Sequence, residues 1–176
     1  MRTRGPQQPV DAADLAVVQR QLGRAPRGIV DVAHRCPCGA PDVVTTAAQL
    51  PDGTPFPTTY YATCPRLTGA LSTLESAGVM SAMQERLGED PQLAQDYRQA
   101  HEAYLADRAR LGEPPEIAGI SAGGMPDRVK CLHVLAAHAL AVGPGVNPLG
   151  DQTLALLPRW WATQPCVTTE NEGDDR

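Results

Sequence analysis

Aromatic residues, lysines and long apolar runs are all scarce in this chain. Aromatic side chains make up 4% of the 176 residues, so leucine, valine and alanine must supply most of a buried core. No segment approaches the ~20 apolar residues of a membrane-spanning helix, because the best stretch, residues 134–142, is short and contains His138. No apolar region follows the arginines of the first residues, so we expect no secretory signal and a cytoplasmic protein.

Charge balance and motif content exclude several further classes of protein. The chain has 15 lysines and arginines against 20 acids, a net charge of −5, which excludes general nucleic-acid binding through bulk positive charge. Neither a P-loop nor a G-x-G-x-x-G motif occurs, so the nucleotide-binding folds that carry them have no support. Glycine and proline, at 16 and 17 residues, are more frequent than in an average chain, which excludes a plain helical bundle and predicts long, shaped loops.

Hydrophobic periodicity predicts a single α+β domain over residues 11–166. In this domain a small antiparallel sheet of about three strands packs against four to six helices. The expected strands are residues 28–34, 43–46 and 58–63. The expected helices are residues 12–22, a segment between Pro65 and Gly78, a long helix that opens at Asp90-Pro91, residues 126–142, and residues 154–161. Residues 1–10 are expected to be flexible, and residues 167–176 form an acidic tail expected to be disordered.

Cysteines are the first candidate site residues. In a reducing compartment they are better metal or catalytic candidates than disulfide partners. Cys36, Cys64 and Cys131 each lie beside a turn or helix start and within two residues of a cation, which favours a thiolate. We hypothesise that these three converge as sulfur ligands of an iron–sulfur cluster or zinc. Cys38 can share a face with Cys36 in an extended segment. The alternative is that the cysteines only pack, which is the commoner role of a single free cysteine. Cys166 is interpreted as incidental.

Two histidines follow Cys131 on the same predicted helix. His133 is two residues away, about 200° around a regular helix, so it can join Cys131 as a fourth ligand only if the helix begins near that point. His138 is seven residues away on the same face and ~10.5 Å along the axis. We therefore expect His138 to line the same pocket rather than to bind the same ion.

The segment from residue 119 to residue 130 predicts an anion-binding pocket. Gly123 and Gly124 free the backbone before a predicted helix start, where unpaired N–H groups attract anions. Cationic side chains would balance cluster charge or bind a small anionic ligand; they are Arg35, Arg66, Arg128 and Lys130. Ser121 stands in a G-x-S-x-G motif, but no parallel strand precedes it, so a serine hydrolase is not favoured. A solvated flexible loop is the alternative.

Four ordered segments resemble one bacterial family, the domain of unknown function 501. They are residues 35–39, residues 63–67, residues 126–133 and residues 143–148, and the likeness extends over roughly residues 12–158. The resemblance implies no established reaction. It implies a genomic context near a septum-formation initiator and an exopolyphosphatase-like protein. It also favours Cys36, Cys64 and Cys131 over Cys38 as ligands.

Three functions follow from these observations. The first is a cysteine-ligated metal or iron–sulfur protein with a basic pocket beside the site. The second is a non-catalytic partner protein of cell-division, envelope or polyphosphate-related machinery, in which the cysteines only pack and an apolar surface around Trp160 and Trp161 binds the partner. The third is a metal-free thiol enzyme with Cys131 as the nucleophile.

Overall fold

The computed structural model describes residues 8–167, so the expected acidic tail lies outside the described residues apart from its first member. It confirms an α+β domain with a small antiparallel sheet. The strands are β1 (Gln8–Pro9), β2 (Ile29–Arg35), β3 (Pro41–Thr46) and β4 (Tyr60–Ala62). The helices are α1 (Ala12–Leu22), α2 (Pro65–Ser76), α3 (Val79–Glu89), α4 (Pro91–Ala109), a 3₁₀ turn (Pro115–Ile117), α5 (Leu132–Val142) and α6 (Pro148–Leu156).

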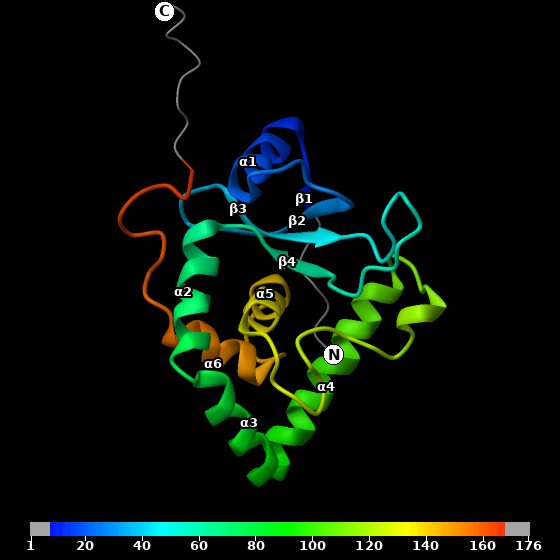
Figure 1. Ribbon diagram of the computed structural model, residues 1–176, viewed down its shortest axis with the longest axis vertical. Coiled ribbons are helices and arrows are strands. Elements are labelled where there is room, and N and C mark those ends of the chain that lie inside the picture. The colour runs from blue at the N-terminus through cyan, green and yellow to red at the C-terminus, as the bar shows by residue number, and fades with distance from the viewer. Residues whose placement is uncertain (1–7, 168–176) are drawn as a thin grey trace, which may run out of the picture.

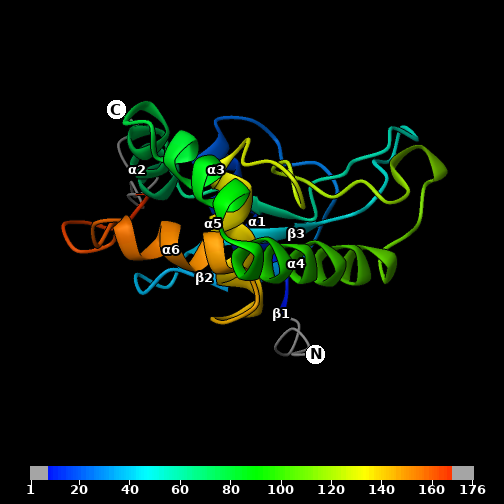
Figure 2. The ribbon, with the colours of Figure 1, turned by 90° about the horizontal axis from the view of Figure 1, so that it is seen from below.

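The strands pair in chain order, β1-β2-β3-β4, with every neighbour antiparallel. The register places Val32 opposite Val44 and Val44 opposite Tyr61. Figure 1 shows α1 on one side of the sheet and α5 on the other, surrounded by α2, α4 and α6. Figure 2, turned by 90°, shows α6 and α4 on either side of α5. The sheet therefore separates one helix from a larger helical layer.

Helix α5 is the centre of that layer because its sequence is apolar on almost every side. Seven of its eleven residues are buried, as expected for a helix that is covered by other elements all round. It contacts β4, α2 and α6. Its partly exposed residues lie in its first and last turns, and of these only His133, in the first turn, has a polar side chain.

Local signals in the sequence placed some helix ends correctly. Asp11 caps α1 by accepting a hydrogen bond from the Asp14 N–H at 2.7 Å, and Gly23 ends it in the left-handed conformation with φ 67°. Asp90 caps α4 in the same way, accepting from the N–H groups of Gln92 and Leu93. These confirm the predicted starts of both helices.

Four features differ from the sequence-based expectation. A strand, β1, forms at residues 8 and 9, within the segment expected to be flexible. Helix α3 was not expected: Gly78, which was to close one helix, is the left-handed N-cap of the next. The late helix begins at Leu132 rather than at residue 126. Helix α6 begins at Pro148, where the Asn147 side chain accepts from the Gly150 N–H at 3.0 Å.

None of the helices in the described part of the chain is both long and apolar enough to cross a lipid bilayer.

Candidate metal centre

Cys131 and His133 lie together with a third side chain, Glu75 of α2. The thiol, a ring nitrogen and a carboxylate oxygen all lie within 4.8 Å of one another. Within residues 8–167, this is the one set of three or more Cys, His, Asp or Glu side chains gathered so closely. The sequence predicted that Cys131 and His133 could share a site, but it did not predict Glu75.

The start of α5 at Leu132 is what brings Cys131 and His133 together. Cys131 is the N-cap and has extended backbone, with φ −157° and ψ 112°. The ~200° that would separate the two side chains in a regular helix therefore does not apply. The sequence predicted that His133 can join Cys131 only if the helix begins near that point, and the helix does begin there.

One polar face of α2 holds the imidazole of His133. Thr68, Ser72 and Glu75 are spaced i, i+4 and i+7, so they share a helix face. Glu75 Oε1 lies 3.1 Å from Nδ1 of His133, and it also accepts a hydrogen bond from the Leu132 N–H at 2.7 Å. The other ring nitrogen, Nε2, lies 3.2 Å from the Thr68 carbonyl oxygen. Glu75 of α2 thus caps the N-terminus of α5, and residues of α2 hold both ring nitrogens of His133.

The electrostatics of the group couple the thiol to the imidazole. Burial alone would raise the pKa of Cys131, but His133 and the Val134 N–H at the helix start outweigh it, and the pKa is lowered. The interaction with Cys131, supported by Glu75, raises the pKa of His133 to about 9 despite partial burial. Glu75 acts against the thiolate, because its negative charge raises the pKa of Cys131.

A cavity of about 530 Å³ opens beside this group. Cys131 and His133 form part of its wall. The rest of the wall comes from the end of α1, from β4 with its flanking residues, and from the first turns of α2 and α5; these residues are Gln21, Leu22, Thr58, Tyr60, Tyr61, Ala62, Thr63, Pro65, Thr68 and Val134. The lining is mixed, with hydroxyl and aromatic groups facing a space large enough for a small organic molecule.

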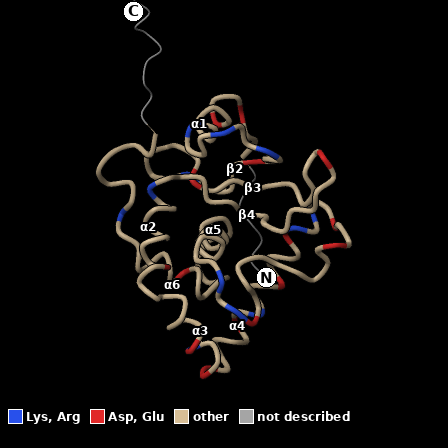
Figure 3. The backbone as a smooth tube through the Cα atoms, viewed as in Figure 1, with Lys and Arg blue, Asp and Glu red and all other residues tan. Residues whose placement is uncertain are grey.

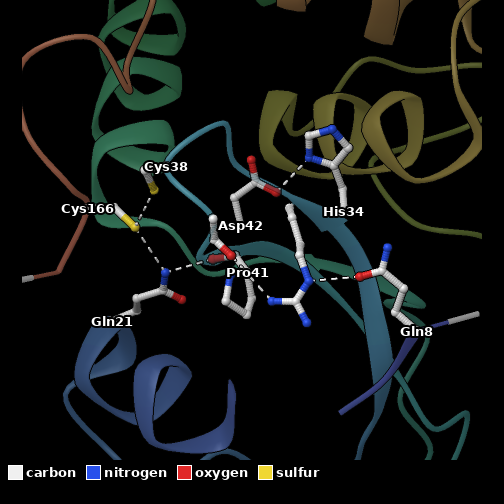
Figure 4. Close-up of polar contacts among 9 residues, drawn as sticks. Gln8, Gln21, His34, Cys38, Pro41, Asp42 and Cys166 are labelled. Carbon is white, nitrogen blue, oxygen red and sulfur yellow. Dashed lines mark hydrogen bonds and ion pairs between the residues drawn. The ribbon is translucent and has the colours of Figure 1, made fainter. Parts of the chain in front are cut away.

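The other expected sulfur ligands lie elsewhere. Cys36, Cys64 and Cys131 do not gather to within 4.8 Å of one another among the described residues. Cys38, in the turn between β2 and β3, instead lies with its sulfur 3.7 Å from that of Cys166. Figure 4 shows this pair at the end of the sheet, near α1. Cys166, interpreted as incidental from the sequence, therefore has a sulfur partner.

Two of the expected cationic side chains are engaged in contacts within the protein. Arg35 makes a two-pronged contact with Asp14, at 2.8 and 2.7 Å. Arg66 donates to Thr163 Oγ1 at 2.7 Å. Arg128 and Lys130 are exposed on the loop before α5, and Figure 3 shows the basic residues dispersed along the chain rather than gathered. The four cations do not line one common wall.

The glycine loop folds back on itself. Gly123 and Gly124 both have positive φ, and their carbonyls accept from the N–H groups of Lys130 and Arg128 at 2.8 and 2.9 Å. A Cβ on Gly124 would lie 2.7 Å from the Arg128 carbonyl oxygen, so glycine is needed there for close backbone approach. Ser121 is buried, with its hydroxyl 2.9 Å from His101 Nδ1. These contacts explain the motif without an anion.

The remaining candidates lie in the interior or at its edge. His138 is fully buried and stacked on Tyr60, so its role is in the core rather than on the wall of the described cavity. Trp160 and Trp161 are both half-buried and pack edge to face on each other, with ring centroids 4.6 Å apart. Trp160 also packs against the core, which reduces the apolar surface available for a partner.

A comparison with known protein families confirms the resemblance that the four sequence segments indicated. The model of the family described as "Protein of unknown function (DUF501)" matches residues 32–155, which is more than half of the chain. The chain belongs to this family. No curated protein and no solved structure matches it. In this DUF501 protein the matched region includes Glu75, Cys131 and His133 and ends before Cys166.

One sequence signal could have found Glu75. Leu67 and Leu71 are buried on α2, and Glu75 continues the same stripe at i+4 and i+8. A carboxylate in line with buried leucines requires a partner, because burial of an unpaired charge is costly. The position of that partner, at the start of α5, depended on the tertiary fold.

Proposed function

We propose that this DUF501 protein is a metal-binding protein whose ion, of the zinc type, is held by Glu75, Cys131 and His133. The observation that carries the proposal is the convergence of a carboxylate, a thiol and an imidazole to within 4.8 Å. Zinc accepts sulfur, nitrogen and oxygen ligands together. The mixed set favours a single ion at this position over an iron–sulfur cluster, which is usually held by cysteines alone.

The surroundings of His133 support metal binding. Metal-ligating histidines usually donate their second ring N–H to a carbonyl or carboxylate, which fixes the tautomer. Nε2 of His133 faces the Thr68 carbonyl at 3.2 Å. This leaves Nδ1, on the Glu75 side at 3.1 Å, as the nitrogen with a lone pair for the ion.

Glu75 favours an ion over a metal-free nucleophile. A carboxylate beside a thiolate opposes its ionisation, as the raising effect on the pKa of Cys131 shows. The same carboxylate stabilises a divalent cation, because two acidic groups and one neutral imidazole then surround a double positive charge. A thiol enzyme would use Glu75 only to orient His133, whose pKa it raises, whereas in a metal centre the carboxylate would bind the ion itself.

Three protein ligands leave one position of a tetrahedral ion open, which is typical of catalytic rather than structural zinc. The cavity of about 530 Å³ that Cys131 and His133 line can supply a small ligand to that position. A bound ion would act there as a Lewis acid on a carbonyl or phosphoryl oxygen or on water. We therefore place a small ligand with such an oxygen in the cavity, in a cytoplasm that keeps Cys131 reduced.

Zinc titration of three variants tests this function. We expect Cys131→Ser, His133→Ala and Glu75→Gln each to weaken zinc binding at one site by more than about tenfold, since loss even of an outer partner of a metal ligand costs about that much. Glu75→Gln is the most specific of the three tests, because the glutamine amide oxygen can still accept the hydrogen bond from the Leu132 N–H while the negative charge is lost. The measurement is zinc affinity and zinc per chain, by competition with a chromophoric chelator.

Ser76→Ala is the matched control on the same helix. The Ser76 hydroxyl donates to the Ser72 carbonyl and is exposed, so we expect its zinc affinity to equal that of the wild type. Equal zinc binding by the wild type, Cys131→Ser and His133→Ala would refute the proposal. Circular dichroism of each variant separates loss of the site from loss of the fold.

Thiol catalysis is the second candidate, favoured by the lowered pKa of Cys131 and its place at a helix start. It predicts that protein purified without zinc has one rapidly alkylated thiol at neutral pH, and that His133→Ala slows this reaction. Rapid alkylation in a protein with no affinity for zinc would favour this function over the metal centre.

A further inference from the structure

Two cysteines outside the candidate metal centre are in contact at the end of the sheet. The sulfur of Cys38, in the turn between β2 and β3, lies 3.7 Å from that of Cys166, although the residues are 128 positions apart in sequence. Both are free thiols, and a disulfide would require their sulfurs to approach by only ~1.7 Å more. Figure 4 shows the pair beside Gln21 of α1.

Contacts other than the sulfur pair hold the C-terminal segment in this place. Gln21 donates its side-chain N–H groups to the Cys166 sulfur at 3.4 Å and to the Pro41 carbonyl at 2.7 Å, so one side chain joins the segment to β3. Arg66, in the first turn of α2, donates to Thr163 Oγ1 at 2.7 Å. The position of Cys166 is therefore fixed by neighbours on α1 and α2 as well as by its sulfur partner.

A small molecule can reach Cys38 before it reaches Cys166. Cys38 is exposed, whereas Cys166 is partly buried. A cavity of about 510 Å³ borders Cys38, and its wall includes Arg20 of α1 and Pro165 of the C-terminal segment. The cavity thus lies where α1, the turn and the C-terminal segment meet.

The electrostatics of the two thiols differ in the same direction. Partial burial would raise the pKa of Cys38, but the N–H groups of Ala40 and Cys166 outweigh it, and the pKa is lowered. Burial raises the pKa of Cys166 to about 12. Because the thiolate is the form that peroxides oxidise, Cys38 is the thiol that reacts first.

We propose that Cys38 and Cys166 are a peroxide-reactive thiol pair, in which oxidation forms a disulfide that fastens the C-terminal segment to the turn between β2 and β3. The Cys38 thiolate attacks one oxygen of hydrogen peroxide; an S–O bond forms, the O–O bond breaks, and hydroxide leaves and is protonated to water. The Cys166 sulfur then attacks the sulfenic acid; the S–S bond forms, the S–O bond breaks, and a second water leaves. Two thiols and one peroxide give one disulfide and two waters, and two electrons pass to the peroxide.

Reversal of this step suits a reducing cytoplasm, where disulfides are usually transient and redox-sensing. A dithiol reductant attacks the exposed Cys38 sulfur, releases the Cys166 thiol, and leaves as its own disulfide. While it lasts, the bond closes a loop of 128 positions, and long loops gain the most stability from closure. We expect the oxidised protein to melt at least about 5 °C higher than the reduced one.

Peroxide treatment of the reduced full-length protein tests the proposal. After one equivalent of hydrogen peroxide at neutral pH, the remaining thiols are alkylated and the peptides are mapped by mass spectrometry. We expect the Cys38–Cys166 disulfide to exceed any other pair at least tenfold, because these sulfurs are already in contact. The same treatment in concentrated urea should abolish this preference. A dominant Cys36–Cys38 disulfide, or an even spread over the five cysteines, would overturn the proposal.

Single-cysteine variants separate the roles of the two thiols. Cys166→Ser should stop at a sulfenic acid on Cys38, which dimedone traps, whereas Cys38→Ser should form no disulfide at Cys166. Cys131→Ser is the matched control, because it removes a proposed metal ligand but should form the Cys38–Cys166 disulfide at the wild-type rate. A Cys166→Ser protein without trapped sulfenic acid on Cys38 would contradict the order of the two steps, whatever zinc does at Cys131.

Limited cleavage with trypsin tests whether the disulfide fastens the segment. Cleavage after the exposed Arg159 detaches residues 160–176, which include Cys166. Oxidation should slow this cleavage at least several-fold, and the fragment should stay attached until a reductant is added. Peroxide should change neither result in Cys166→Ser. Equal cleavage and equal release of the fragment before and after oxidation would refute the fastening role.

Discussion

Gly150→Ala is expected to destabilise the protein by about 3 kcal/mol, at the upper end of the usual cost of overpacking. A Cβ at this position would lie 2.3 Å from the Leu135 carbonyl oxygen and 2.8 Å from the Ala139 side chain. Both belong to α5, the buried centre of the fold. Because the obstacle is the backbone of a packed helix, relief requires α6 to move away from α5, which opens the core. Urea denaturation would measure the loss, and we expect the melting temperature to fall by roughly 10 °C.

Gly69→Ala is the matched control for this prediction. Gly69 lies inside α2, and a Cβ there would meet nothing within 4 Å. Helix propensity alone should then stabilise the protein by up to about 1 kcal/mol. The same propensity gain applies to Gly150, so a net loss there isolates the packing cost. A Gly150→Ala protein as stable as the wild type would show that α5 and α6 are not in close contact.

The close contact of α5 with α6 also matters for the candidate metal centre. The position of α5 decides where Cys131 and His133 lie relative to Glu75 on α2. A shift of α5 by a fraction of an ångström would be felt at its N-terminus, since packed helices move as rigid bodies. Gly150 thus helps to position Cys131 and His133 through α5, although it does not contact them.

Helix ends were predictable from the sequence where a single capping residue determines the end. Asp11, Gly23 and Asp90 act through their own side chain or backbone conformation, so the sequence alone identifies them. The sequence does not predict helix α3, because Gly78 is a typical helix end, whereas here Ala77 caps the end of α2 and Gly78 begins α3. Pro126 predicts a helix start in the glycine-rich loop before α5, because proline is favourable in the first turn of a helix. Its backbone hydrogen bonds instead go to Gly123 and Gly124, which a linear pattern cannot show.

The candidate site residues divide in the same way. Cys131 and His133 are close in sequence, and one condition on the helix start determined whether they could meet. Glu75 and Cys166 lie 56 and 35 residues from Cys131, and only the packing of α2 and of the C-terminal segment decides their partners. Residue type indicated Cys131 and His133 as candidates, but which side chains lie together depended on topology. The sequence grouped Cys131 with Cys36 and Cys64, whereas the structure places Cys131 with Glu75 and His133.

The stability of the protein is expected to fall on acidification because of His138. This histidine is fully buried, stacks on Tyr60 and meets the edge of Tyr104. Asn147 Nδ2 lies 3.2 Å from its Nδ1, so Nδ1 accepts and Nε2 carries the proton. Nε2 is buried without a hydrogen-bond partner among the described residues. Burial lowers the pKa of His138 to about 4, from 6.5 in the unfolded chain.

The sign of the effect follows from these two pKa values. Above pH 6.5 the residue is neutral in both states, and it costs no stability. As the pH falls below 6.5 the unfolded chain takes up a proton that the folded protein resists until about pH 4, so unfolding becomes easier. The loss is about 2 kcal/mol at pH 5 and about 3 kcal/mol by pH 4. Urea denaturation at pH 7.5, 6, 5 and 4 would measure it.

His138→Phe separates this residue from every other acid-sensitive group. Phenylalanine keeps an aromatic ring between Tyr60 and Tyr104 but does not titrate, at the cost of one hydrogen bond from Asn147. Carboxylates and the other histidines titrate in both proteins, so the difference between the two pH curves belongs to residue 138. We expect the variant to be less stable than the wild type at pH 7.5 and to approach it as the pH falls to 4. Parallel curves would show that His138 takes up its proton in the folded core as readily as in the unfolded chain, which a fully enclosed imidazole cannot do without opening α5.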